Sequence, residues 1–166
     1  MSMTDYRVIV VGTDGSSLAK PTVARAAWLA KHNDADLVIV CAHSSLSRRD
    51  EANNVATLGG DARGGEVLGR AAANDALTKA VAVAAENGAT VAAALMIEGD
   101  AASALIETAK ERNAELLVLG ARSDVSFVER LLGTVAREVV DRALCDVLII
   151  RPHQAGEIPV PEDASG

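Results

Sequence analysis

The chain has 166 residues, which is enough for one domain with a hydrophobic core of its own. Hydrophobic residues make up 49% of it and aromatic residues only 2%, so the chain is not a disordered one, and its core must be built from Ala, Val, Leu and Ile. The few aromatic side chains offer little for bases to stack on, and the net charge of -7 would repel a phosphate backbone, so both features argue against a nucleic-acid partner.

The first seven residues contain no apolar signal core, and no stretch of the chain approaches the roughly 18 apolar residues of a membrane span. We therefore expect a cytoplasmic protein with no membrane partner. Cys41 and Cys145 lie in apolar, strand-like surroundings, which predicts two buried, reduced thiols. No CxxC pair or Cys/His cluster indicates a metal site.

Five unbroken apolar runs predict five strands, at residues 8–11, 37–42, 91–97, 116–119 and 147–150. A half-exposed strand would alternate polar and apolar residues, whereas these runs are continuous. Continuous Val, Ile and Leu are typical of parallel strands that are covered on both faces.

Helical patterns fill the segments between these runs. A helix over residues 68–85 is predicted to stop at Gly88, and Asp100 has the position of an N-cap before the next helix. Three further stripes place apolar residues on one helical face. They are Val23, Ala26, Ala27 and Ala30; Ala102, Leu105, Ile106 and Ala109; and Val135, Val139, Val140 and Ala143.

This alternation predicts a doubly wound, Rossmann-like α/β domain with a five-stranded parallel sheet and right-handed crossovers, over residues 1–152. Two stretches do not fit it. Residues 44–65 are polar and Gly-rich, which indicates either a mobile flap or a variable insertion. Residues 153–166 carry two prolines and three acidic residues, which predicts a disordered tail.

In open parallel sheets, ligands bind beyond the carboxyl ends of the strands, where the strand order reverses. Asp14 follows the first run. Its structural role would be to hold its own turn or to cap the next helix, and its functional role would be to accept hydrogen bonds from a ribose or base. Gly133 and Thr134 open the last helix, either as an ordinary helix start or as a place where a phosphate meets free N–H groups. Gly120 marks either a tight turn or a place where only backbone fits.

The sequence shows no catalytic machinery. It has no Ser-His-Asp order, no GxSxG turn and no paired carboxylates in a recognisable setting. His43 fits a solvated loop residue better than a general base, because no acidic neighbour orients it. There is no Walker-type GxxxxGK[ST] and so no lysine placed for a γ-phosphate. We therefore expect a protein that is not an enzyme, with slow ATP hydrolysis left open.

Two stretches resemble the universal stress proteins. "VIVVGTDGSSLAKPTVARAAWLA" is similar to that family's first strand and helix, and "LLGTVAREVV" followed by "CDVLIIRP" is similar to its last unit. The ATP-binding branch of the family carries G-x2-G-x9-G-[S/T], and this chain has Gly120, Ser123, Gly133 and Thr134 at that spacing. Ser123 therefore stands where the motif has a glycine. The resemblance covers about residues 6–152.

The resemblance implies the strand order 3-2-1-4-5, with helices on both faces. It also implies a homodimer joined through the last strand, about residues 146–151, with Val147 and Ile149 at the interface. The adenine-ribose end of the ligand would lie near the first two strands and its phosphate end near the fourth strand and last helix. The residues expected to bind it are Gly12, Thr13, Asp14, Ala42, Gly120, Arg122, Ser123, Gly133, Thr134 and Val135.

The function that this resemblance implies is a stress-response protein that binds an adenine nucleotide as a sensor or switch. ATP is the expected ligand, with AMP or cyclic AMP as alternatives and Mg²⁺ accompanying ATP. The alternative is a nucleotide-free, dimeric adaptor of the same fold, and Ser123 separates the two. A nucleotide-hydrolysing enzyme ranks below both, and a flavoprotein is disfavoured because few aromatic residues could stack on its ring.

Overall fold

The computed structural model describes residues 5–44, 67–121 and 132–152, in which strands and helices alternate. The polar stretch at 45–65 and the tail at 153–166 lie outside the described residues, so the predictions made for them stay predictions. The elements in chain order are β1 (Val8–Gly12), α1 (Ala19–Asn33), β2 (Asp36–Ser44), β3 (Val67–Leu68), α3 (Arg70–Glu86), β4 (Thr90–Glu98), α4 (Ala101–Glu111), β5 (Leu116–Gly120), α5 (Thr134–Arg142) and β6 (Asp146–Ile150).

The strands form one parallel sheet. The central strand β1 pairs with β2 on one side and with β5 on the other, so that Val10 lies between Val38 and Leu117. β4 extends the sheet beyond β2, and β6 extends it beyond β5. The order β4-β2-β1-β5-β6 confirms the predicted order 3-2-1-4-5. The two-residue β3, which was not predicted, pairs with the last two residues of β2.

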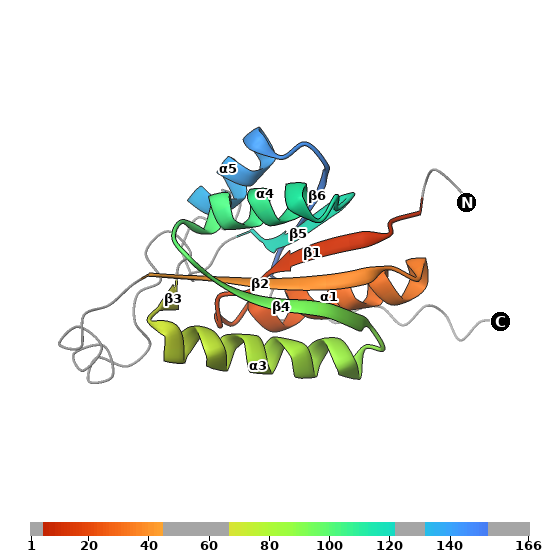
Figure 1. The fold of residues 1–166 in the computed structure, drawn as a ribbon, viewed down its shortest axis with the longest axis horizontal. Coiled ribbons are helices and arrows are strands. Elements are labelled where there is room, and N and C mark those ends of the chain that lie inside the picture. Colours follow the sequence, from red (N-terminus) through yellow and green to blue (C-terminus); the bar gives the residue numbers. More distant parts are fainter. Residues whose placement is uncertain (1–4, 45–66, 122–131, 153–166) are drawn as a thin grey trace.

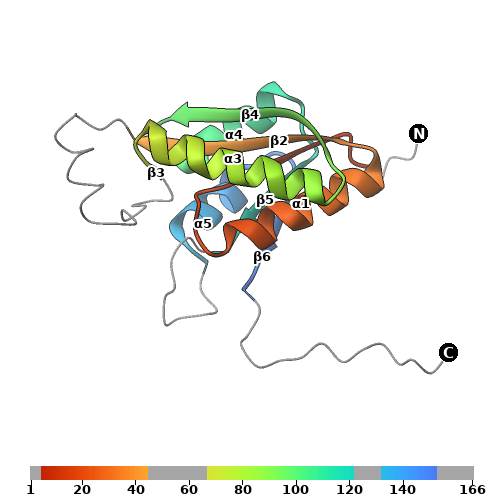
Figure 2. The ribbon, with the colours of Figure 1, turned by 90° about the horizontal axis from the view of Figure 1, so that it is seen from below.

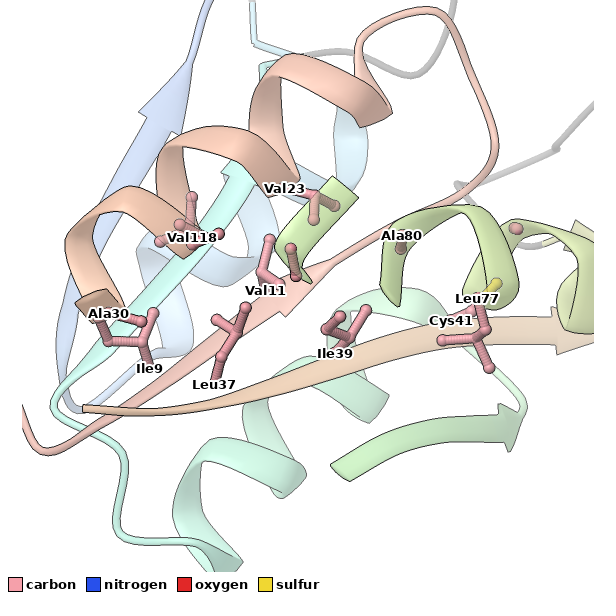
Figure 3. Close-up of a cluster of buried hydrophobic side chains, with 14 of the residues drawn as sticks. Ile9, Val11, Val23, Ala30, Leu37, Ile39, Cys41, Leu77, Ala80 and Val118 are labelled. Carbon is pink, nitrogen blue, oxygen red and sulfur yellow. The ribbon is translucent and has the colours of Figure 1, made fainter. Parts of the chain in front are cut away.

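Helices cover both faces of this sheet (Figure 1). α1 and α3 lie together on one face, and α4 and α5 lie on the other, as the perpendicular view also shows (Figure 2). Alternate residues of the central strands therefore enter two separate cores. Ile9 and Val11 face α1 and α3 (Figure 3), while Val10 faces α4 and α5. This burial on both sides explains the continuous apolar runs.

The prediction of two-sided burial is wrong for the edge strands. In β4, Ala92 and Ala94 are exposed, and a bulge interrupts the pairing with β2 between Leu37 and Val38. In β6, residues 147–150 are only partly buried. An edge strand has a neighbour on one side alone, so the helices that cover the middle of the sheet reach it incompletely.

The helix predictions are confirmed with small shifts. The apolar stripe of α1 is buried throughout, whereas Val140 on α5 is 48% exposed and does not belong to the buried face. α3 begins at Arg70, two residues later than predicted, because Leu68 pairs in β3. It ends before Gly88, whose φ of +78° favours glycine.

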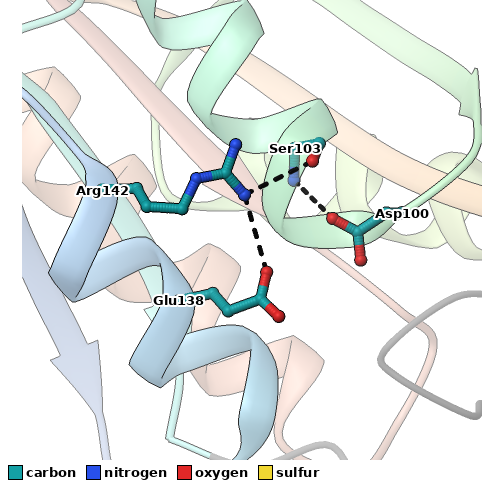
Figure 4. Close-up of polar contacts among 4 residues, drawn as sticks. All are labelled: Asp100, Ser103, Glu138 and Arg142. Atoms are coloured by element: carbon teal, nitrogen blue, oxygen red, sulfur yellow. Dashed lines mark hydrogen bonds and ion pairs between the residues drawn. The ribbon is translucent and has the colours of Figure 1, made fainter.

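Asp100 is the N-cap of α4, as predicted. Its Oδ2 accepts a hydrogen bond from the backbone N–H of Ser103 at 2.9 Å. Arg142, the last residue of α5, donates to Ser103 Oγ at 3.5 Å and lies 3.6 Å from Glu138 (Figure 4). One of the free N–H groups at the start of α4 is thus capped by a side chain of this chain.

The two thiols differ in exposure. Cys41 in β2 is fully buried, but Cys145 is only partly buried, so the prediction for Cys145 is wrong. Burial, and after it the negative charge of Asp14, raise the pKa of the Cys41 thiol from its usual 9.0 to about 12. In the part of the chain described here, no helix is long and apolar enough to cross a membrane.

Candidate functional site

The carboxyl ends of β1 and β5 lie side by side at the point where the strand order reverses. From β1 the chain continues into α1 on one face, and the helix that follows β5 in the order of elements, α5, lies on the other face (Figure 1). We call this edge of the sheet, with the end of β2 beside it, the carboxyl edge. It is the position at which open α/β sheets bind ligands.

The loop after β1 is held by two hydrogen bonds and a glycine turn. The N–H of Thr13 donates to the carbonyl of Val40 at 2.9 Å, which extends the pairing of β1 with β2 by one residue. Asp14 Oδ1 accepts from the N–H of Ser16 at 2.9 Å, and Gly15 has a φ of +76°. Asp14 therefore holds its own turn and does not cap α1, whose N-cap is Leu18.

The start of α5 is tied to the end of β5. The N–H of Gly133 donates to the carbonyl of Ala121 at 2.8 Å, and Ala121 in turn donates to Ile150 at 2.8 Å. Gly133 is the N-cap, with an extended backbone (φ −66°, ψ 168°) and no side-chain cap. The first backbone bond inside the helix runs from Arg137 to Gly133, so the N–H groups of residues 134–136 have no acceptor within the helix.

Two glycines at the carboxyl edge lie against leucine side chains that pack on the sheet. A Cβ on Gly120 would lie 2.9 Å from Leu18 Cδ2 of the segment that opens α1. A Cβ on Gly12 would lie 3.1 Å from Leu105 Cδ2 of α4, on the opposite face. Gly120 ends β5 as a regular strand residue, so the reading of it as a tight turn is wrong. A contact of either glycine with a ligand stays a prediction.

The end of β2 differs most from the sequence-based expectation. His43 is 5% exposed and forms part of the strand, so its interpretation as a solvated loop residue is wrong. His43 Nδ1 and Ser44 Oγ are buried, and neither has a hydrogen-bond partner among the residues that the structure describes. Ala42 before them is also buried, at 5% exposure.

An open groove of about 460 Å³ lies at the opposite edge of the sheet, near the amino ends of the strands. Its polar contact is a hydrogen bond of 2.9 Å from the Tyr6 hydroxyl to Asp146 Oδ2, which raises the pKa of Tyr6. None of the residues predicted to bind a ligand lines it. The lining residues are Tyr6, Leu29, Leu116, Asp146, Val147 and Leu148.

The structure brings most of the predicted site residues together at the carboxyl edge. Arg122 and Ser123 lie outside the described residues. Within those residues, no group of three or more His, Cys, Asp or Glu side chains could hold a metal ion. The predicted residues that the structure places at this edge are Gly12, Thr13, Asp14, Ala42, Gly120, Gly133, Thr134 and Val135.

Sequence reasoning missed the two orphaned polar atoms at the end of β2. The available signal was position, since His43 and Ser44 directly follow an apolar run whose end belongs to the carboxyl edge. β3, whose two residues pair with His43 and Ser44, was not predicted as a strand, so β2 was expected to end before them.

Comparisons with known proteins give one consistent family. The model of the Universal stress protein family matches residues 5–151. Universal stress protein Rv1636 of Mycobacterium tuberculosis is 34% identical over 148 residues, a match that covers 89% of this chain and 98% of that protein. Universal stress protein MJ0531 of Methanocaldococcus jannaschii is 28% identical over 151 residues, covering 88% of this chain and 82% of that protein.

Solved structures share the fold. A universal stress protein in complex with cAMP aligns with a TM-score of 0.67 at 32% identity, and the match covers 89% of this chain and 99% of that chain. The arrangement of strands and helices is therefore shared over nearly the whole length of both proteins.

Proposed function

The chain belongs to the universal stress protein family, and from that premise we propose that it binds an adenine nucleotide at the carboxyl edge. The bound nucleotide acts as the signal of a sensor or switch in the stress response. ATP is the expected ligand, and AMP and cyclic AMP are the alternatives.

The observation that carries this proposal is the position of the α5 start. The bond from Gly133 to Ala121 places the first N–H groups of α5 beside the end of β5, at the point where the strand order reverses. The positive end of a helix dipole, together with N–H groups that lack an acceptor in the helix, is a ready site for a phosphate. Gly133 has no side chain that could occupy it.

A relative supports the choice of an adenine nucleotide. The similar structure with 32% identity holds cAMP, which contains an adenine base and a phosphate. The G-x2-S-x9-G-T spacing from Gly120 to Thr134 supports ATP. If Mg²⁺ accompanies ATP, the phosphates supply its ligands, since the described residues contain no metal-binding cluster of their own.

We propose that the nucleotide acts through its binding, with slow ATP hydrolysis left open. The sequence has no Walker lysine and no oriented base, and these are the groups that activate phosphoryl transfer. A nucleotide-free adaptor of the same fold remains the competing function, and the serine at position 123 is the residue that favours it.

We further propose a homodimer joined through β6. This strand lies at the edge of the sheet and is only partly buried, and an exposed strand edge is a ready partner for a second copy. The groove that Val147 and Leu148 line lies beside it and would add apolar area to the contact. Ile149 belongs to the same strand and is also partly buried.

The test is native mass spectrometry of freshly purified protein, followed by calorimetry with ATP, AMP and cyclic AMP. We expect a dimeric mass that carries adenine nucleotide, and saturable binding of at least one of the three. A protein that is dimeric but binds none of them is the adaptor. A monomer at micromolar concentration contradicts the interface through β6.

A further inference from the structure

We propose that His43, at the end of β2, binds the base of the nucleotide through its Nδ1 atom. This inference rests on the proposed function and names a residue that the family motif does not include. Three observations carry it: the burial of an unpartnered nitrogen, its position at the same edge of the sheet as Asp14, and the distribution of charge along the carboxyl edge.

The first observation is the orphaned nitrogen. His43 is 95% buried, and its Nδ1 has no hydrogen-bond partner among the described residues. A buried polar atom without a partner costs folding free energy of about 1–3 kcal/mol, and most such atoms in proteins are satisfied. A ligand that supplies the missing bond explains why a histidine stands where a leucine would pack. Ser44 Oγ, next along the strand, is a second unpartnered atom at the same strand end.

The second observation is the face of the sheet. His43 and Cys41 are two residues apart on one strand, so their side chains point to the same face, which α1 and α3 cover. The negative charge of Asp14 also contributes, after burial, to the raised pKa of Cys41. β1 and β2 are paired up to Gly12 and Val40, and the Thr13 bond extends that pairing. His43 and Asp14 therefore both follow the last paired residues of β1 and β2, at the same edge of the sheet.

The third observation decides which part of a nucleotide lies there. The carboxylate of Asp14 repels a phosphate, whereas the start of α5 attracts one. The phosphate therefore binds near β5, and the uncharged base lies toward β2. Two strand spacings separate these ends, roughly 10 Å, which suits the length of a nucleotide.

The chemistry of the two partners also matches. Adenine presents ring-nitrogen acceptors and an amino donor on its edges. Neutral imidazole can carry its proton on either nitrogen, so Nδ1 can donate to a ring nitrogen or accept from the amino group. Either bond satisfies the buried atom, and the tautomer follows from the bond that forms.

The test compares His43→Leu and His43→Asn by calorimetry with AMP and with ribose 5-phosphate, which lacks the base. Leucine fills the site without a polar atom, whereas asparagine keeps one near the position of Nδ1. We expect His43→Leu to weaken AMP about tenfold, His43→Asn to weaken it less than threefold, and ribose 5-phosphate to bind all forms equally. The matched control is His32→Leu, the same change at an exposed position near the end of α1.

Thermal unfolding without ligand tests whether His43 is needed for stability. Because leucine removes an unsatisfied buried atom, His43→Leu should not lower the unfolding midpoint. A second measurement needs no substitution at His43: in ¹⁵N-histidine protein, the His43 Nδ1 resonance should shift with AMP and not with ribose 5-phosphate.

The following results would overturn the inference. Equal AMP affinity in His43→Leu, or equal losses for AMP and ribose 5-phosphate, would remove His43 from the base site while leaving the proposed function intact. A wild-type protein that binds neither AMP, ATP nor cyclic AMP removes both.

Discussion

Gly120 and Gly133 look alike in the sequence, since each stands at a boundary between a strand and a helix in the same motif. In the structure they have different surroundings. A Cβ on Gly120 would lie 2.9 Å from Leu18 and 3.4 Å from Thr22 Oγ1, so the space beside it is filled by the protein itself. Gly133 opens a helix with no side-chain cap, next to N–H groups that have no acceptor within the helix.

A glycine in this motif can therefore allow close packing within the protein or leave space for a ligand. At Gly120 the missing side chain lets the start of α1 pack closely on β5. At Gly133 the missing side chain leaves the positive end of α5 open to an anion. Neither glycine has a positive φ, so backbone freedom is not the reason for either. Substitutions at Gly133 should therefore lower nucleotide affinity, whereas substitutions at Gly120 should lower stability.

The largest effect is expected for Gly133→Asp. A carboxylate at the start of α5 would compete with a phosphate for the same N–H groups and repel it, so nucleotide affinity should fall at least about a hundredfold, or about 2.7 kcal/mol. The fold should be kept, because Asp is a favourable N-cap in the extended conformation that Gly133 adopts. Calorimetry with ATP and chemical unfolding of the same samples measure the two quantities.

The control for Gly133→Asp is Asn113→Asp. Asn113 is exposed at the far end of α4 and has a φ of +53°, which Asp tolerates. Its replacement by Asp adds the same negative charge away from the carboxyl edge. It should leave ATP binding within about twofold of wild type, a difference of under 0.5 kcal/mol. Equal ATP affinity in wild type and Gly133→Asp would falsify the assignment of α5 to the phosphate.

The next effect is expected for Gly120→Ala, in stability. A Cβ at 2.9 Å from Leu18 Cδ2 forces the buried Leu18 side chain to shift, and overpacking of this kind costs about 1–3 kcal/mol. Urea unfolding should show a lower midpoint with an unchanged slope.

A double-mutant cycle with Leu18→Ala identifies the cause of that loss. In the shortened background the added methyl group has room, so Gly120→Ala should cost less than about 0.5 kcal/mol there. An equal cost in both backgrounds contradicts the packing explanation for Gly120.

The sequence predicted the sheet well because the central strands are buried on both faces. Continuous runs such as residues 37–42 are typical of strands covered on both faces, and this pattern predicted both the strand type and the fold class. Prediction was weaker at the edges, where β4 and β6 have the same composition as central strands but only partial cover. The composition of a strand does not show whether it lies at the edge or in the centre of the sheet.

The candidate site was predictable in position but not in detail. The rule for open sheets placed the ligand at the ends of β1 and β5, and the structure puts the α5 start there. The packing role of Gly120 depends on Leu18, which is about a hundred residues away in sequence and reaches Gly120 only in the fold. His43 likewise belongs to β2 because that strand runs on to Ser44, where it pairs with β3.

A smaller effect is expected for Ser123→Gly, which restores the glycine that the family motif has between Gly120 and Gly133 in the sequence. If wild type binds ATP, a serine at this position already permits binding, and its replacement should change affinity by no more than about tenfold, or about 1.4 kcal/mol. Calorimetry on both proteins measures the change. Should wild type show no binding and Ser123→Gly restore it, the chain is the nucleotide-free adaptor.

The smallest effect is expected at α4, whose start differs from that of α5 because a side chain of the protein already occupies it. Asp100 Oδ2 accepts from Ser103 N–H at 2.9 Å, so Asp100→Ala leaves that N–H without its cap and should lower the free energy of unfolding by about 1 kcal/mol. Asp100→Asn keeps the acceptor and should cost only a few tenths of that, about 0.3 kcal/mol. Urea unfolding resolves the two. Nucleotide affinity should stay unchanged in both variants, because the phosphate is expected at the uncapped start of α5 and not at α4. A loss of ATP binding in Asp100→Ala that matches the loss in Gly133→Asp contradicts this division between the two helices.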